Sequence, residues 1–169
     1  MTARLAARPA AVPMLPLGLT IAAVVLVADQ IVKAWILSWL GPAPVAVALT
    51  PFVNLVSVWN YGISFGLFNT GSAAAAYLFV VLALAIASAL VVWLKRTDRR
   101  LIAAALGLII GGAIGNIVDR LRFGAVYDFL DFHVLGWHWP AFNVADTGVS
   151  IGVALLLIDA LFASSPSSK

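Results

Sequence analysis

The sequence predicts an all-α membrane protein in which four transmembrane helices carry a small extracytoplasmic β-sheet and an interfacial loop or helix. Of the 169 residues, 63% are hydrophobic and only 10% are charged, and the mean hydropathy is +1.07. An ordinary soluble domain carries about a quarter charged residues, and a chain of this length has too little interior to bury so much apolar sequence. We therefore expect residues 1–169 to form a single membrane domain whose apolar surface faces lipid.

Four apolar stretches are long enough to cross a bilayer core, which needs about 20 helical residues. They cover residues 17–40, 73–94, 101–118 and 144–163, of which the third is the shortest. The first stretch begins like a signal peptide, with basic residues before an apolar run. We expect it to be retained, because it contains Asp29 and Lys33, which a disposable signal has little reason to keep.

Basic residues set the expected orientation, because loops that stay in the cytoplasm keep Lys and Arg. They precede the first span, join the second to the third, and end the chain: Arg4, Arg8, Lys95, Arg96, Arg99, Arg100 and Lys169. Only Arg120 and Arg122 lie in the other two connections. We therefore predict a multi-pass protein with both termini in the cytoplasm. This topology accounts for the net charge of +3, so no nucleic-acid partner is expected.

The two outward connections differ in composition from the spans. Residues 45–72 contain the segment 54–62, which is rich in β-branched and aromatic residues and predicts short strands with a turn on the membrane surface. Residues 119–143 mix aromatic side chains with Asp, Arg and His, a composition typical of the interface between water and lipid.

Two charged residues interrupt the first span. Asp29 and Lys33 lie four residues apart on one helix face, where they can neutralise each other. A charge near the bilayer centre costs a few kcal/mol, so such residues usually have a partner or a function. Two interpretations stay open, namely a structural ion pair that orders the bundle and a direct role in binding a substrate.

The outward end of the third span combines small and polar residues. Gly111 and Gly115 have the spacing that lets another helix approach closely. Asn116, Asp119 and Arg120 share one side of the helix, as expected of a structural polar cluster.

The fourth span opens with the candidate N-cap Asn143 and with Asp146, whose place in the first turn suits the helix dipole. Capping alone would explain this placement. However, Asp146 also meets the membrane level of the loop residue Asp128. Two carboxyl groups that lie close together share one proton, and such a pair can activate water for attack on a peptide carbonyl.

Other chemistries lack their residues in this sequence. There is no cysteine and no glutamate, which removes thiolate sites and the His-Glu-x-x-His zinc pattern. His133 and His138 lie in an aromatic segment and are interpreted as interfacial polar residues. Ser57 and Ser64 lack a His or Lys at a spacing known for serine nucleophiles. We expect neither a metal nor a cofactor.

Taken together, the motifs resemble those of lipoprotein signal peptidase, also called signal peptidase II, over nearly the whole chain. In chain order they are Asp29-x-x-x-Lys33, Asn60-x-Gly62-x-x-Phe65, Gly115-Asn116-x-x-Asp119-Arg120, Val126-x-Asp128-Phe129 and Phe142-Asn143-x-Ala145-Asp146. Each motif is weak alone, whereas five in this order on a frame of four spans are specific.

The resemblance implies a monomeric aspartic endopeptidase of the bacterial inner membrane, with its active site facing the periplasm. Its substrate would be a prolipoprotein whose lipobox cysteine carries a diacylglyceryl group, and cleavage would fall N-terminal to that cysteine. Asp128 and Asp146 match the family's catalytic pair. The positions that match residues around the pair are Asn60, Gly62, Asn116, Asp119, Arg120, Asn143, Asp29 and Lys33.

The resemblance also implies membrane lipid as a partner and the cyclic peptide globomycin as an inhibitor. The outward loops would clamp a partly unwound signal peptide over the carboxyl pair, and Gly62, Gly66 and Gly71 are candidate hinges for that movement.

Two other functions stay open on the residues alone. A small ion or proton transporter subunit would use Asp29, Lys33 and the outward acids as an ion path. A non-catalytic scaffold would use every aspartate structurally. Replacing Asp128 or Asp146 by Asn distinguishes the three readings, because only the peptidase requires both carboxyl groups.

Overall fold

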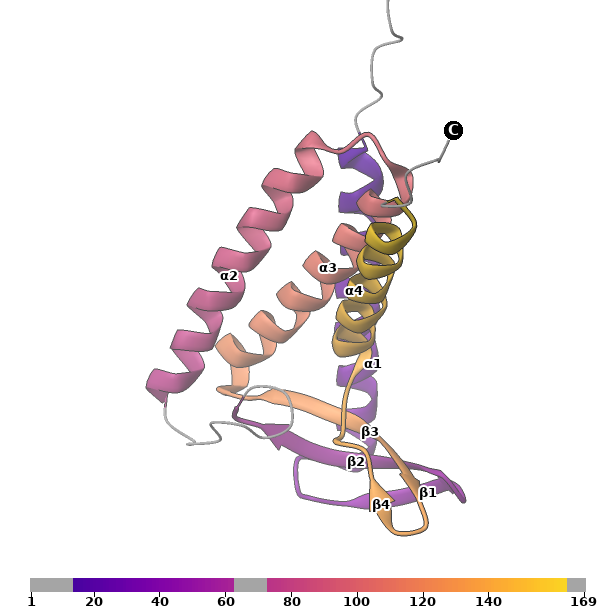
Figure 1. Ribbon diagram of the computed structural model, residues 1–169. Helices are drawn as coiled ribbons and strands as arrows, with labels where there is room; N and C mark the ends of the chain where they lie inside the picture. Colours follow the sequence, from indigo (N-terminus) through magenta and orange to yellow (C-terminus); the bar gives the residue numbers. More distant parts are fainter. Residues whose placement is uncertain (1–13, 63–72, 164–169) are drawn as a thin grey trace, which may run out of the picture.

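The computed structural model describes residues 14–62 and 73–163, in which four long helices meet a small antiparallel sheet at one end (Figure 1). The helices are α1 (Leu15–Leu40), α2 (Ala73–Arg96), α3 (Arg100–Phe123) and α4 (Val144–Ala163). The strands are β1 (Ala46–Thr50), β2 (Val53–Asn60), β3 (Val126–Val134) and β4 (Trp137–His138). All four helices are long and apolar enough to cross a membrane, and the predicted fold class is confirmed. Among the residues discussed above, Arg4, Arg8, Ser64, Phe65, Gly66, Gly71 and Lys169 lie outside the described ranges.

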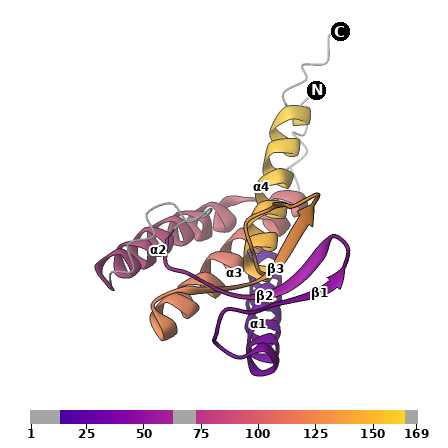
Figure 2. The ribbon, with the colours of Figure 1, turned by 90° about the horizontal axis from the view of Figure 1, so that it is seen from below.

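Helix α3 is the centre of the bundle. Over its most apolar stretch 56% of the residues are buried, against 22% in α1, 22% in α2 and 17% in α4. Figures 1 and 2 show α2 on one side of α3, and α1 with α4 on the other. The outer helices leave large apolar side chains exposed, among them Val27, Leu78 and Leu157. Such continuous apolar surface is expected where a protein faces lipid.

Glycines on two faces of α3 allow this close packing. A Cβ atom on Gly111 would lie 2.5 Å from the Ala22 carbonyl oxygen of α1. A Cβ atom on Gly112 would collide with the Ala145 carbonyl oxygen of α4. The backbone of α3 therefore touches the backbones of both neighbours, and Gly111 makes the helix contact that its spacing predicts.

Helix α3 runs to Phe123, beyond the predicted end of the third span at residue 118. It ends where Gly124 adopts a left-handed conformation with φ of 75° and donates its N–H to the Arg120 carbonyl oxygen. The apolar run stops at Val118, but the backbone helix continues through the polar residues that follow. The helix, and with it the candidate membrane span, therefore extends beyond the apolar run.

The sheet takes two strands from the α1–α2 connection and two from the α3–α4 connection, in the order β1-β2-β3-β4. Strands β2 and β3 are antiparallel, with Val58 opposite Asp128 and Asn60 opposite Val126. The sequence indicated strands only in the first connection and suggested a loop at Asp128, whereas the structure places Asp128 in β3. This pairing joins segments far apart in the chain, so no local pattern reveals it.

The sheet is fixed to the bundle by an apolar cluster beneath it. Tyr127 and Phe129 of β3 pack with Ile36 of α1, and all three side chains are buried.

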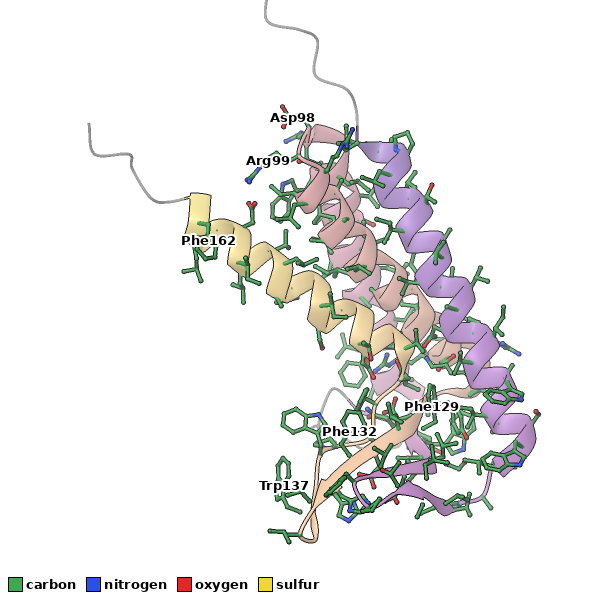
Figure 3. All side chains as sticks on the ribbon, turned by 90° about the vertical axis from the view of Figure 1, so that its right-hand side faces the viewer. Asp98, Arg99, Phe129, Phe132, Trp137 and Phe162 are labelled. Carbon is green, nitrogen blue, oxygen red and sulfur yellow. The ribbon has the colours of Figure 1, made fainter. Side chains whose placement is uncertain are left out.

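At the opposite end of the bundle, the guanidinium of Arg99 binds the Asp159 carboxylate of α4 with N–O distances of 2.6 and 2.5 Å. Figure 3 shows Arg99 at this far end. A bidentate pair of this kind fixes direction as well as distance.

We predict that Gly112→Val lowers the thermal stability of the protein. The added side chain must displace the backbone of α4 or bend α3, and overpacking of this kind costs about 1–3 kcal/mol or more. Thermal unfolding in detergent measures the effect. Ala85→Val, at an exposed position of α2, is the control and should unfold near the wild-type temperature. Equal midpoints for the two variants would contradict the role given to Gly112.

Candidate active site

A buried lysine joins two buried aspartates at the sheet end of the bundle. Lys33 Nζ lies 2.8 Å from Asp29 Oδ2 within α1 and 2.8 Å from Asp119 Oδ2 of α3. The exposed fractions of Lys33, Asp29 and Asp119 are 4%, 0% and 2%. The predicted pairing of Asp29 with Lys33 is therefore found, and Asp119 is a second partner. Charges this deeply buried persist only when they are paired and hydrogen-bonded.

Each carboxylate oxygen of the two aspartates accepts at least one hydrogen bond or ion pair. Gln30 Nε2 donates to Asp29 Oδ2 at 3.2 Å and to Asp119 Oδ1 at 3.0 Å. The backbone N–H of Ala145 donates to Asp29 Oδ1 at 2.9 Å, and that of Tyr127 donates to Asp119 Oδ2 at 3.1 Å. One polar cluster thus joins α1, α3, β3 and the start of α4.

These two backbone hydrogen bonds determine where the predicted catalytic residues lie. Ala145 immediately precedes Asp146, and Tyr127 immediately precedes Asp128. The buried cluster therefore holds the backbone directly beside each of the two carboxyl groups. Because β3 and α4 bind the same cluster, their positions relative to each other are fixed through it.

Asn143 links the two carboxyl groups directly. Its side-chain oxygen accepts a hydrogen bond from the backbone N–H of Asp146 at 2.9 Å, and its backbone N–H donates to Asp146 Oδ2 at 3.3 Å. This reciprocal arrangement is a capping box, and it confirms Asn143 as the N-cap of α4. The Asn143 amide also donates to Asp128 Oδ1 at 2.7 Å.

Each carboxyl group has one further amide donor. Asn116 Nδ2 donates to Asp146 Oδ1 at 2.8 Å, and Asn60 Nδ2 donates to Asp128 Oδ2 at 3.2 Å. The Asn116 side-chain oxygen accepts from Lys33 Nζ at 3.2 Å, which orients its NH₂ group toward Asp146. Lys33 therefore orients the neutral Asn116 side chain, which in turn donates to the Asp146 carboxyl group.

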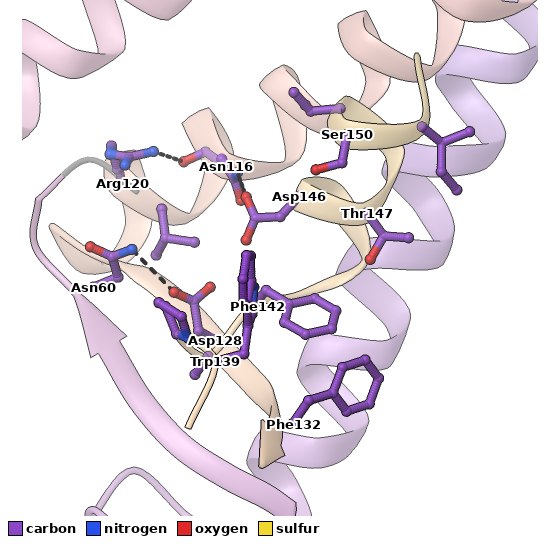
Figure 4. A pocket seen from close by; sticks show the side chains of 15 residues that line it. Asn60, Asn116, Arg120, Asp128, Phe132, Trp139, Phe142, Asp146, Thr147 and Ser150 are labelled. Carbon is purple, nitrogen blue, oxygen red and sulfur yellow. Dashed lines mark hydrogen bonds between the residues drawn. The ribbon is translucent and has the colours of Figure 1, made fainter. Parts of the chain in front are cut away.

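Both carboxyl groups face one cavity of about 490 Å³ (Figure 4). Asp128 enters it from β3 and Asp146 from α4. The polar side of the wall includes Asn60, Asn116 and Arg120. The remaining wall includes Phe132, Trp139, Phe142, Thr147 and Ser150. A cavity with convergent polar groups on one side and aromatic groups on the other suits an amphipathic ligand.

Burial raises the pKa of Asp128 from 3.8 to about 7. Loss of hydration is the largest cause, because it disfavours the charged form, and the nearby Asp146 carboxylate adds to it. Hydrogen bonds from Asn60 and Asn143 and the charge of Lys33 oppose the rise without cancelling it. Asp128 is therefore partly protonated near neutral pH.

Arg120 connects the cavity to the outward connection after β2. Its guanidinium donates to the Gly62 carbonyl oxygen at 2.9 Å and lies 5.7 Å from the centre of the Phe79 ring on α2. Gly62 in turn donates its N–H to the Asn60 side-chain oxygen at 3.1 Å. This chain of contacts orients Asn60, whose amide reaches Asp128.

The structure brings every predicted site residue to this end of the bundle. Those that line the cavity are Asn60, Asn116, Arg120, Asp128 and Asp146. Those that reach them through hydrogen bonds or ion pairs are Asp29, Lys33, Gly62, Asp119 and Asn143. Sequence reasoning missed Gln30, although a polar residue beside Asp29 within a span was a usable signal. The aromatic and hydroxyl residues of the wall carried no such signal, because only the approach of β3 to α4 groups them.

The two histidines lie together and make a separate polar group. Their rings are stacked with centres 5.0 Å apart, and His138 Nδ1 lies 2.8 Å from Asp131 Oδ2. Within residues 14–62 and 73–163, no group of three or more His, Asp, Glu or Cys residues is arranged to hold a metal ion.

A matching family model and similar relatives all bear the description of signal peptidase II or lipoprotein signal peptidase. A family model described as Signal peptidase (SPase) II matches residues 21–162. A lipoprotein signal peptidase of Methylobacterium sp. (strain 4-46) is 47% identical over 147 residues, which cover 86% of this chain and 89% of that protein. A lipoprotein signal peptidase of Pseudoalteromonas atlantica is 43% identical, with 83% of this chain and 87% of the relative covered.

Two solved structures share the fold. Both are described as bacterial membrane enzyme structures obtained by the in meso method, and both are 29% identical in sequence to this chain. The first has a TM-score of 0.79 and covers 91% of this chain and 93% of its own. The second has a TM-score of 0.75, with coverages of 89% and 95%.

We predict that the protein loses stability as the pH rises, and that Asp128→Asn reduces this loss. A carboxyl group whose pKa is higher in the folded state than in the unfolded chain contributes stability that is complete below about pH 3.8 and is lost as the pH passes about 7. Unfolding midpoints in detergent at about pH 5 and about pH 8 measure it. Asp98→Asn, at an exposed position at the far end, should keep the wild-type difference. An unchanged difference in Asp128→Asn would contradict the assignment.

Proposed function

The chain belongs to the signal peptidase II family, and we propose on this premise that it is an aspartic endopeptidase that removes the signal peptide from diacylglyceryl-modified prolipoproteins. Cleavage occurs N-terminal to the lipidated cysteine, at the outer face of the inner membrane. The observation that carries the proposal is that Asp128 and Asp146, from two different elements, line one cavity and are bridged by Asn143.

The two carboxyl groups have different roles because their environments differ. We assign the role of acid to Asp128, because its pKa is raised to about 7 and the group is partly protonated at neutral pH. We assign the role of base to Asp146, because it lies in the first turn of α4, where the helix dipole and the donors from Asn116 and Asn143 favour negative charge. The pair nevertheless titrates as a unit, because each charge alters the proton affinity of the other.

The reaction follows from this asymmetry. Asp146 takes a proton from a water molecule, whose oxygen attacks the scissile carbonyl carbon while Asp128 donates a hydrogen bond to the carbonyl oxygen. The tetrahedral intermediate collapses by breaking the C–N bond, and the departing nitrogen receives a proton from the carboxyl pair. The products are the signal peptide with a new carboxyl terminus and a lipoprotein with a free amino group on its lipidated cysteine.

The position of the cavity suits a substrate that is itself embedded in the membrane. The cavity lies where α3 and α4 meet the sheet, so a signal-peptide helix alongside the bundle presents its end at this level. The basic residues of the α2–α3 connection lie at the opposite end. By the positive-inside rule that end is cytoplasmic, and the cavity faces the periplasm. A monomer contains every residue that this mechanism uses.

A transporter function fits less well. An ion path needs carboxylates that can exchange partners, whereas each side-chain oxygen of Asp29 already has a donor in Lys33, Gln30 or Ala145. Of the two interpretations left open for Asp29 and Lys33, these contacts favour the structural ion pair over a direct role in binding a substrate.

We predict that Asp128→Asn and Asp146→Asn each reduce cleavage of a lipidated prolipoprotein on the order of a thousandfold or more, because loss of either group removes the acid or the base. Cleavage in detergent with purified protein measures the rate, and thermal unfolding verifies the fold. Asp131→Asn is the matched control, since Asp131 lies on the same strand outside the cavity lining. Turnover retained by either variant would refute the pair.

We also predict that a substrate lacking the diacylglyceryl group is cleaved much more slowly than the lipidated one. Without the diacylglyceryl group the aromatic and apolar half of the cavity wall loses its acyl-chain partner, so binding free energy is lost. Parallel assays with the two substrates, matched in peptide sequence, measure the ratio. Equal rates would remove the lipid-specific part of the proposal and leave the aspartic mechanism intact.

A further inference from the structure

The turn between β3 and β4 contains a leucine in an unusual backbone conformation. Val134 pairs with Trp137, so Leu135 and Gly136 form the two-residue turn. Their φ angles are 50° and 81°. Two positive φ angles are what a type I′ hairpin turn requires, and Asn-Gly is the sequence that adopts it most readily. Leucine at the first position is strained, because its Cβ crowds the backbone there.

Nothing within the described chain compensates this strain. The exposed fraction of Leu135 is 103%, so its side chain gains no packing from its neighbours. A turn that served only to reverse the chain would be more stable with Asn at this position. An apolar side chain held outward in a strained conformation points to a contact beyond the chain itself.

The surroundings of Leu135 are apolar and uncharged. Residues 132–142 contain no Asp, Glu, Lys or Arg. Val134, Trp137 and Trp139 are 49%, 62% and 46% exposed, and the two tryptophan rings meet edge to face at 5.8 Å. We call Val134, Leu135, Trp137 and Trp139 the hairpin tip. Exposed tryptophans beside uncharged apolar residues are typical of the boundary between lipid headgroups and acyl chains.

The base of the same hairpin is polar. The stacked histidines and the contact of His138 with Asp131 lie there, and the Asn54 amide donates to Asp131 Oδ2 at 2.8 Å. Polarity therefore changes along the hairpin, from a polar base to an apolar tip. This is the gradient of an element that crosses from headgroups into acyl chains.

The hairpin tip lies on the same side of the molecule as the outer face of α4 (Figure 3). Figure 3 shows Trp137 and Phe132 on the same side of the molecule as Phe162 of α4. Trp139 and Ile151 line the same cavity, and Ile151 is 48% exposed on α4. A lipid layer on this side of α4 therefore also faces the hairpin tip (Figure 3).

We infer that the hairpin tip inserts into the leaflet at the sheet end of the bundle, where phospholipid acyl chains cover Leu135 and Trp137. The inserted tip anchors the β3–β4 hairpin, and two residues of this segment, Phe132 and Trp139, line the cavity. This inference does not depend on the proposed cleavage, because it concerns a contact with lipid in the absence of substrate.

The absence of cysteine permits a direct test. Single-cysteine variants Leu135→Cys, Ile151→Cys and Asp98→Cys are spin-labelled in lipid nanodiscs, in which both faces of the membrane are open to solvent. Collision of each label with oxygen, which concentrates in lipid, is compared with collision with a water-soluble nickel chelate. We expect the label at position 135 to have the ratio found at position 151. A ratio equal to that at position 98 would overturn the inference, as would protection from both probes, which would indicate a protein partner or a second copy.

A second variant separates lipid contact from loss of the turn. Leu135→Asn suits the backbone conformation, so the hairpin stays folded while its apolar tip is weakened. A label at Trp137→Cys should then become several-fold more accessible to the nickel chelate. Leu49→Asn, at an exposed leucine of β1, is the matched background and should leave the label unchanged. No change in the Leu135→Asn background would count against the inference.

Discussion

The buried contact of Lys33 with Asp29 and Asp119 is the interaction on which the site depends. It places a charged cluster inside a bundle that has little else polar, and its cost is offset because every oxygen finds a donor. Two of those donors are backbone N–H groups of β3 and α4. The cluster therefore does more than neutralise charge, because it determines where two separately folded segments meet.

The proposed mechanism assigns different roles to the two carboxyl groups because their surroundings differ. Asp128 is carried by a strand that is covered on both sides, so loss of hydration raises its pKa. Asp146 is carried by the first turn of a helix, where backbone dipoles favour an anion. Asn143 reaches both groups, so the distance between them follows from a capping box rather than from a flexible loop.

Much of this architecture could be predicted from the sequence, because the membrane imposes simple rules. The four spans follow from apolar length, the pairing of Asp29 with Lys33 from helical spacing, and the N-cap at Asn143 from its place before the fourth span. What escaped prediction depends on contacts between distant segments. The third helix extends beyond its apolar run, Asp128 lies on strand β3, and Gln30 donates hydrogen bonds to Asp29 and Asp119 in the buried polar cluster. The aromatic wall from Phe132 to Phe142 likewise exists only because β3 lies beside α4.

The glycine contacts of α3 have a consequence for how the molecule responds to its surroundings. Bilayers differ in thickness, and helices usually adjust by changing their tilt. Gly111 and Gly112 hold α3 against α1 and α4 backbone to backbone, so these three helices cannot tilt independently without collision. Among the described residues, α2 packs mainly on α3, and its close contact with Gly18 of α1 is made by the Leu94 side chain rather than by backbone. We therefore expect α2 to change its tilt most in a thinner or thicker membrane, while the carboxyl pair keeps its geometry.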